Sequence, residues 1–153
     1  MHGAILKGDA TEAKRLILDP SNDINYVDDM GKTALLYTAE SGLDDVVEAC
    51  IIAGAKAEFT NKEAAGVLDS LDGYEAYGSK YNGYTALMMA AKGGLTDVIN
   101  KLVDAGARTD IGSTYPYEAG VTALMFAIER KQGAAAEMLI QRSFKGSSST
   151  RKG

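Results

Sequence analysis

The chain has 153 residues and a net charge of −5, which suits one domain, and it has no apolar run near the roughly 20 residues that a membrane-spanning helix needs. Its one cysteine excludes an intramolecular disulfide. Its one histidine, His2, lies at an end that we expect to be mobile, which excludes a Ser-His-Asp or Cys-His nucleophile and a histidine-rich metal site. Residues 142–153 hold four Lys or Arg and no acid, which leaves 12 Lys or Arg against 21 Asp or Glu in residues 1–141. A body charge of −9 repels a phosphate backbone, so we expect no nucleic acid and favour a partner with a basic surface.

The first unit, residues 1–27, is predicted to be a degenerate helix pair. A short apolar stretch ends at Gly8, and Ala13, Leu16 and Ile17 then follow at the spacing of one buried helical face. The start of the chain leads directly into this unit, without a basic and then apolar signal segment, so we expect a cytoplasmic protein with no membrane attachment.

The second unit, residues 28–59, contains the clearest local signals. Thr33 follows a turn glycine and is well placed to cap a short apolar helix, which Gly42 closes. A second apolar helix comes next, and Cys50 falls on its buried face. We therefore interpret Cys50 as a small core residue and not as a reactive thiol.

An insertion at residues 60–79 separates the second unit from the third. A capping box at Thr60–Glu63, followed by Val67, Leu68 and Leu71 at helical spacing, predicts a short helix there. Six of the eight tyrosines lie in or beside this insertion and the shorter one at 114–118. Two interpretations stay open, because tyrosines can pack as a lid over the insert helix or can form a contact surface like that of an antibody paratope. Proximity to the insert helix favours packing for Tyr74 and Tyr77, whereas the others favour recognition: Tyr81, Tyr84, Tyr115 and Tyr117.

The third and fourth units, residues 80–112 and 117–142, repeat the signals of the second. Each has a turn glycine followed by a Thr-Ala-Leu sequence, at Gly83–Leu87 and at Gly120–Leu124. Polar residues on the outer face of the fourth unit are expected to cap the stack of units: Glu129, Arg130, Lys131, Gln132 and Glu137. Residues 143–153, which consist mainly of Ser, Gly, Lys and Arg, are expected to form a disordered tail.

These three copies resemble the ankyrin repeat, a β-turn followed by two antiparallel helices over about 33 residues. The family's Thr-Pro-Leu-His signature has the form Thr-Ala-Leu here, and the Pro and the His are absent. The resemblance spans roughly residues 3–142. It implies an all-α, helix-turn-helix solenoid of about four repeats, with β-turn finger loops and one long insertion.

The resemblance also implies a non-enzymatic protein-protein interaction module, which we expect to be a monomer. Such a module binds its partner through the finger loops and the concave face formed by the first helix of each unit. Carried onto this sequence, the partner-binding surface comprises Asp29, Met30, Lys32, Glu40, Ser41, Tyr81, Asn82, Tyr84, Lys92, Tyr115, Tyr117, Glu118, Glu129 and Arg130.

No set of residues indicates a reaction, and we predict no enzyme activity, no cofactor and no metal site. The sequence contains no Gly-x-x-x-x-Gly-Lys-Ser/Thr phosphate loop and no Gly-x-Gly-x-x-Gly turn. Asp44 and Asp45 open a helix, where capping and the helix dipole explain them. Two other functions stay open. The chain could be an inhibitor or immunity-type protein that blocks the active site of a basic enzyme or toxin, or a scaffold fragment of a longer chain.

Overall fold

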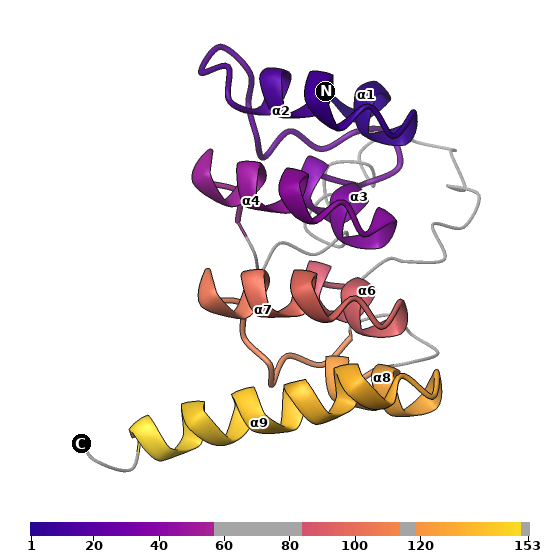
Figure 1. Ribbon diagram of the computed structural model, residues 1–153, viewed down its shortest axis with the longest axis vertical. Helices are drawn as coiled ribbons and strands as arrows, with labels where there is room; N and C mark the ends of the chain where they lie inside the picture. Colours follow the sequence, from indigo (N-terminus) through magenta and orange to yellow (C-terminus); the bar gives the residue numbers. More distant parts are fainter. Residues whose placement is uncertain (57–83, 114–118, 151–153) are drawn as a thin grey trace, which may run out of the picture.

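The computed structural model describes residues 1–56, 84–113 and 119–150, with side chains as far as residue 144. All regular elements within these ranges are helices, and they follow one another as four antiparallel pairs that we call units one to four. Figure 1 shows the pairs stacked one upon the next, with unit one at one end and unit four at the other. The helices are α1 (His2–Leu6), α2 (Ala10–Ile17), α3 (Ala34–Ser41), α4 (Asp44–Ile52), α6 (Ala86–Lys92), α7 (Thr96–Asp104), α8 (Ala123–Glu129) and α9 (Gly133–Thr150).

The helices form two layers. The first helices of the units contact one another in the order α1, α3, α6 and α8, and the second helices do so in the order α2, α4, α7 and α9. This is the solenoid that the sequence predicts, in which the main helix contacts of the described residues join adjacent units. In the part of the chain that the structure describes, no helix combines the length and the apolar character that crossing a membrane requires.

The predicted threonine caps are confirmed. The hydroxyl oxygens of Thr33, Thr85 and Thr122 each accept a hydrogen bond from the backbone N–H three residues later, at 3.3, 3.3 and 3.4 Å. Each bond satisfies one N–H of the first helical turn, which has no partner within the helix. The three first helices therefore begin at equivalent residues of their units.

The turn between the two helices of each unit needs a left-handed residue. Gly8, Gly42 and Gly94 adopt φ values of 72°, 70° and 68° at this position, as the sequence predicts for Gly42 and Gly94. Unit four places Lys131 there, with φ 58°, the one non-glycine residue with positive φ in the described ranges. A side chain in this conformation costs about 1–2 kcal/mol.

The core lies between the stacked units. Cys50, Leu102 and Leu139 occupy equivalent positions on three second helices, and each is fully buried. Burial raises the pKa of the Cys50 thiol to about 12, so this cysteine is a core residue and is poorly reactive, as predicted.

Two parts of the chain differ from the sequence-based expectation. His2 is not at a loose end, because it lies in α1 with its ring centroid 5.4 Å from that of Tyr37 and 5.8 Å from that of Tyr26. Burial lowers the pKa of the His2 imidazole, although the nearby Asp28 carboxylate opposes this shift. The last helix does not end near Arg142, since α9 continues to Thr150. A helix that is already formed on the stack extends readily through residues that contain no proline.

The base of the finger loop before α8 is closely packed. Ser113 and Gly120 lie opposite each other, where the N–H of Gly120 donates to the carbonyl oxygen of Ser113 at 2.8 Å. A Cβ added to Gly112 would lie 2.7 Å from the Cα of Gly120, so this position accepts only glycine. The predicted insert helix at 60–72, with Tyr74 and Tyr77 after it, lies outside the described residues.

Leu102→Ala tests the stacking of the units. Leu102 is fully buried, so its truncation should lower the free energy of unfolding by about 2–5 kcal/mol through lost burial and the cavity left behind. Leu18→Ala is the matched control, because Leu18 is 52% exposed and its truncation should have little effect. Urea unfolding followed by circular dichroism makes the comparison, and equal losses in the two variants would contradict the described packing.

Lys131→Gly tests the left-handed turn of unit four. Removing the side chain should relieve the strain of φ 58° and raise the free energy of unfolding by about 1 kcal/mol, after the entropic cost of glycine is subtracted. Gly8→Ala makes the reverse change at φ 72°, where the added Cβ meets no atom within 4 Å, and should destabilise by a similar amount. Thermal unfolding measures both variants, and a lower melting temperature for Lys131→Gly would be inconsistent with this conformation.

Candidate functional site

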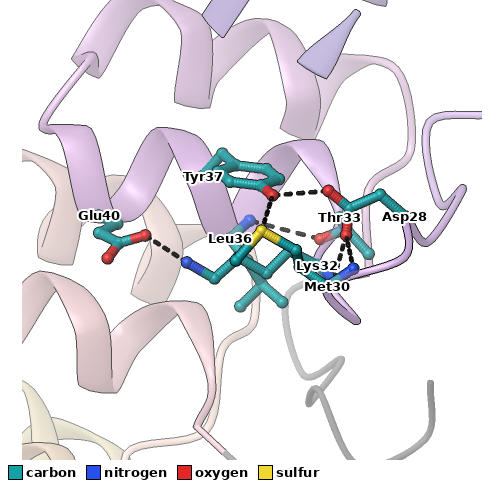
Figure 2. Close-up of polar contacts among 7 residues, drawn as sticks. All are labelled: Asp28, Met30, Lys32, Thr33, Leu36, Tyr37 and Glu40. Carbon is teal, nitrogen blue, oxygen red and sulfur yellow. Dashed lines mark hydrogen bonds and ion pairs between the residues drawn. The ribbon is translucent and has the colours of Figure 1, made fainter. Parts of the chain in front are cut away.

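The finger turn before α3 is organised by the carboxylate of Asp28. Its Oδ1 accepts hydrogen bonds from the backbone N–H groups of Met30 and Lys32, both at 3.0 Å, as Figure 2 shows. The N–H of Gly31 donates to the carbonyl oxygen of Asp28 at 2.9 Å, and Gly31 adopts φ 72°. These bonds close the turn in one conformation and leave Met30 57% exposed at its tip.

Tyr37 of α3 joins this turn to the helix layer. Its hydroxyl donates to the second carboxylate oxygen of Asp28 at 2.6 Å and lies 3.7 Å from the sulfur of Met30 (Figure 2). Burial, reinforced by the hydrogen bond to Asp28, raises the pKa of Tyr37 well above its usual value. The phenol therefore stays protonated and keeps donating at physiological pH, which fixes the finger relative to α3.

Lys32 has a different role from the predicted one. It was expected on the binding surface, but only 4% of the residue is exposed. Its Nζ lies 2.7 Å from the carboxylate of Glu40 and 4.9 Å above the ring of Tyr37. Long lysine stems commonly pack along apolar surface in this way. Lys32 thus orients Glu40, whose side chain is 38% exposed, and is itself largely hidden from a partner.

Tyr84 also differs from its predicted role in recognition, because the residue is 2% exposed. Its ring packs edge-on against that of Phe126 in unit four, with the centroids 5.2 Å apart. The Nζ of Lys92 lies 4.5 Å from the Tyr84 ring and 4.7 Å from the Phe126 ring. Burial lowers the pKa of Lys92, and so does the positive charge of Arg130. Tyr84 therefore belongs to the packing between units three and four.

Predicted residues that do reach the surface lie at matching positions of the first helices. Glu40 and Ser41 end α3, Lys92 ends α6, and Glu129 and Arg130 lie at the end of α8. Because α3, α6 and α8 lie side by side, these helix ends form a row along one side of the stack (Figure 1). Lys92 is half-buried, whereas the other members of the row and the two residues at the finger tip are exposed: Glu40, Ser41, Glu129, Arg130, Asp29 and Met30. We call these seven residues the inner row.

Sequence reasoning missed one surface residue. Leu6 of α1 is 65% exposed and lies two residues before Gly8, just as Glu40 lies two residues before Gly42. Aligning the two glycines would have placed Leu6 at the end of the inner row. The remaining predicted site residues lie outside the described ranges: Tyr81, Asn82, Tyr115, Tyr117 and Glu118.

The described side chains offer no metal-binding cluster, since no three His, Cys, Asp or Glu residues come together in these ranges. The arrangement instead provides alternating charges on a fixed framework. Glu40, Lys92 and Glu129 present acid, base and acid on successive units, and the buried contacts of Lys32 and Tyr84 hold their supporting helices in place. Such a surface can bind another macromolecule without a chemical step.

Comparisons with known proteins agree with this architecture. A family model described as ankyrin repeats, in three copies, matches residues 1–111 and 61–150. The crystal structure of the human ASB11 ankyrin repeat domain matches with a TM-score of 0.68 and 18% sequence identity, over 92% of this chain and 52% of that one. The chain thus spans about half the length of that domain, and at this identity the likeness shows the fold alone.

No curated protein matches the sequence. Among solved structures, 314 chains match, so the fold is widespread and identifies no particular partner. Ankyrin repeats are protein-interaction modules in general. The family model covers nearly all of the sequence, and the four stacked helix pairs have the architecture that the family model implies. The chain belongs to the ankyrin repeat family.

Proposed function

We propose that the chain is a non-enzymatic binding module that holds another protein against the finger turn and the inner row. The observation that supports this most directly is the way buried groups fix the exposed ones. Asp28 and Tyr37 hold Met30 at the turn, and Lys32 holds Glu40. A surface that is ordered before association loses less entropy when a partner binds.

The charge of the chain indicates which partners this surface favours. Residues 1–141 carry −9, and three of the seven inner-row residues are acids: Asp29, Glu40 and Glu129. We propose a partner with a mainly basic surface that also supplies a carboxylate opposite Lys92 and Arg130, because complementary charges raise the association rate and fix the register. An inhibitor that blocks a basic active site is the narrower form of the same proposal. We further propose a cytoplasmic monomer, in which the buried Cys50 stays reduced.

Affinity capture from a cell extract tests the inner row. Met30→Ala combined with Glu40→Ala removes an exposed apolar tip and an oriented carboxylate and should weaken binding of the captured partner at least about tenfold. Ile52→Ala is the matched control, because Ile52 is 71% exposed on α4, in the other helix layer. Quantitative mass spectrometry should recover the partner with the parent chain and the control but not with the double variant. The proposal would be contradicted if the parent chain, the control and the double variant were equally stable and recovered equal amounts of the partner.

Tyr84→Ala should act on folding and not on binding. Its ring is buried against Phe126 and Lys92, so truncation should lower the free energy of unfolding by about 3–5 kcal/mol. Tyr26→Ala is the matched control, since Tyr26 is 54% exposed. Denaturant unfolding measures both variants. If Tyr84→Ala were as stable as the parent chain but bound its partner poorly, Tyr84 would be a recognition residue and the packing role would be contradicted.

A further inference from the structure

His2 lies where α1 meets the finger turn before α3. Its ring contacts two aromatic rings, with centroids 5.8 Å from that of Tyr26 and 5.4 Å from that of Tyr37. The planes of His2 and Tyr37 are inclined at 70°, so these two rings meet edge to face. The hydroxyl of Tyr37 in turn donates to Asp28, which organises the turn. Support for the finger turn therefore comes from α1 as well as from α3.

The Nε2 atom of His2 is buried and has no hydrogen-bond partner among the described residues. A neutral imidazole leaves one of its two nitrogens without a proton, and Nε2 can be that nitrogen here. In the imidazolium both nitrogens carry a proton, so Nε2 would become a buried donor without an acceptor, which costs free energy. The surroundings of His2 therefore suit its neutral form and not its charged form.

The charges around His2 do not remove this cost. Burial has the largest effect and lowers the pKa of His2 below its ordinary value of about 6.5. The Asp28 carboxylate and the backbone of Lys32 favour the imidazolium, whereas the amino group of Met1 disfavours it. Other charged side chains on the elements packed against α1 have partners of their own: Lys32 with Glu40, Glu12 with Arg15, Lys14 with Asp45, and Asp9 with the first turn of α2. His2 is thus mainly neutral at pH 7.

Protonation of His2 would act on the finger turn through Tyr37. The new Nε2–H needs an acceptor, which is either water outside the ring contacts or the carboxylate of Asp28. Movement towards water withdraws the ring that supports Tyr37. Movement towards Asp28 competes with the Tyr37 hydroxyl, whose 2.6 Å bond fixes the turn to α3 (Figure 2). Either movement loosens the turn that holds Met30 at its tip.

We propose that the finger turn is a pH-sensitive switch, which is closed when His2 is neutral and open when His2 is protonated. The open state binds a proton more tightly than the closed state, so acid favours the open state. The stabilising effect of neutral His2 is complete above its ordinary pKa and is lost as the pH falls through the lowered pKa. A partner bound at Met30 would then be released in mild acid. That consequence rests on the proposed function, whereas the switch itself does not.

Amide hydrogen exchange of the free, full chain tests the switch, after correction for the intrinsic effect of pH on exchange. Between about pH 7.5 and about pH 5.5, protection of the Met30 and Lys32 N–H groups should fall by about three- to tenfold, where tenfold is the limit one unit below an open-state pKa of about 6.5. His2 is the chain's one histidine, and His2→Phe keeps an aromatic ring without a titrating group, so its protection should stay constant. The N–H groups of Met88 and Met125, which capping threonines of units three and four hold, are the internal control.

Three results would overturn the proposal. One is unchanged protection of Met30 and Lys32 in the parent chain, and another is an equal loss in the parent chain and in His2→Phe. The third is an equal loss at Met88 and Met125, because the opening would then not be local to the finger turn. Circular dichroism checks that His2→Phe is folded, and His2→Gln, which also cannot titrate, makes the same comparison if it is not. No partner is present in this experiment, so its failure is distinct from a failure of the proposed function.

Discussion

Stacking of one helix pair on the next is the interaction on which the rest of this structure depends. A single pair cannot bury its apolar side alone. Cys50, Leu102 and Leu139 are fully buried, and their helices α4, α7 and α9 pack on one another from unit to unit. The same stacking sets α3, α6 and α8 side by side and brings the ends of three distant segments into one row. Met125 and Ile128 of α8 show the same dependence, because they stay exposed where no described unit follows.

Polar groups at the finger turn and on α3 then decide how rigid the exposed surface is. Asp28 receives two backbone N–H groups and one phenol, and hydrogen bonds to a charged acceptor contribute about 1.5–3 kcal/mol each. The side chain of Lys32 is buried, and its ammonium group forms an ion pair with the carboxylate of Glu40. These bonds connect the finger turn to both ends of α3 and make them one rigid unit. A rigid unit of this kind suits recognition by a preformed surface.

The units, the threonine caps, the left-handed glycines and the burial of Cys50 could all be predicted from the sequence. Each of these features depends on local chemistry or on the period of a helix. The burial of Lys32 and Tyr84, which each directly precede a capping threonine, could not be predicted in the same way. Both have a polar end on a long or broad apolar body, so packing against Tyr37 or Phe126 decides whether they are hidden. The polar end expected for unit four is wrong at Met125 and Ile128, which are exposed although the equivalent residues of unit two, Leu36 and Ala39, are buried. The repeat pattern predicts burial at these two positions, and that burial requires a following unit.

Hydrogen–deuterium exchange of the chain, free and bound to its captured partner, tests the central claim that the finger turn and the inner row form the binding surface. We expect binding to slow exchange in residues 28–41, 84–93 and 119–130 and to leave the second helices α4 and α7 unchanged. In the free protein, the N–H groups of Met30 and Lys32 should already exchange slowly, because Asp28 holds both. Protection confined to α2, α4 and α7, or rapid exchange of the finger turn before binding, would contradict the account.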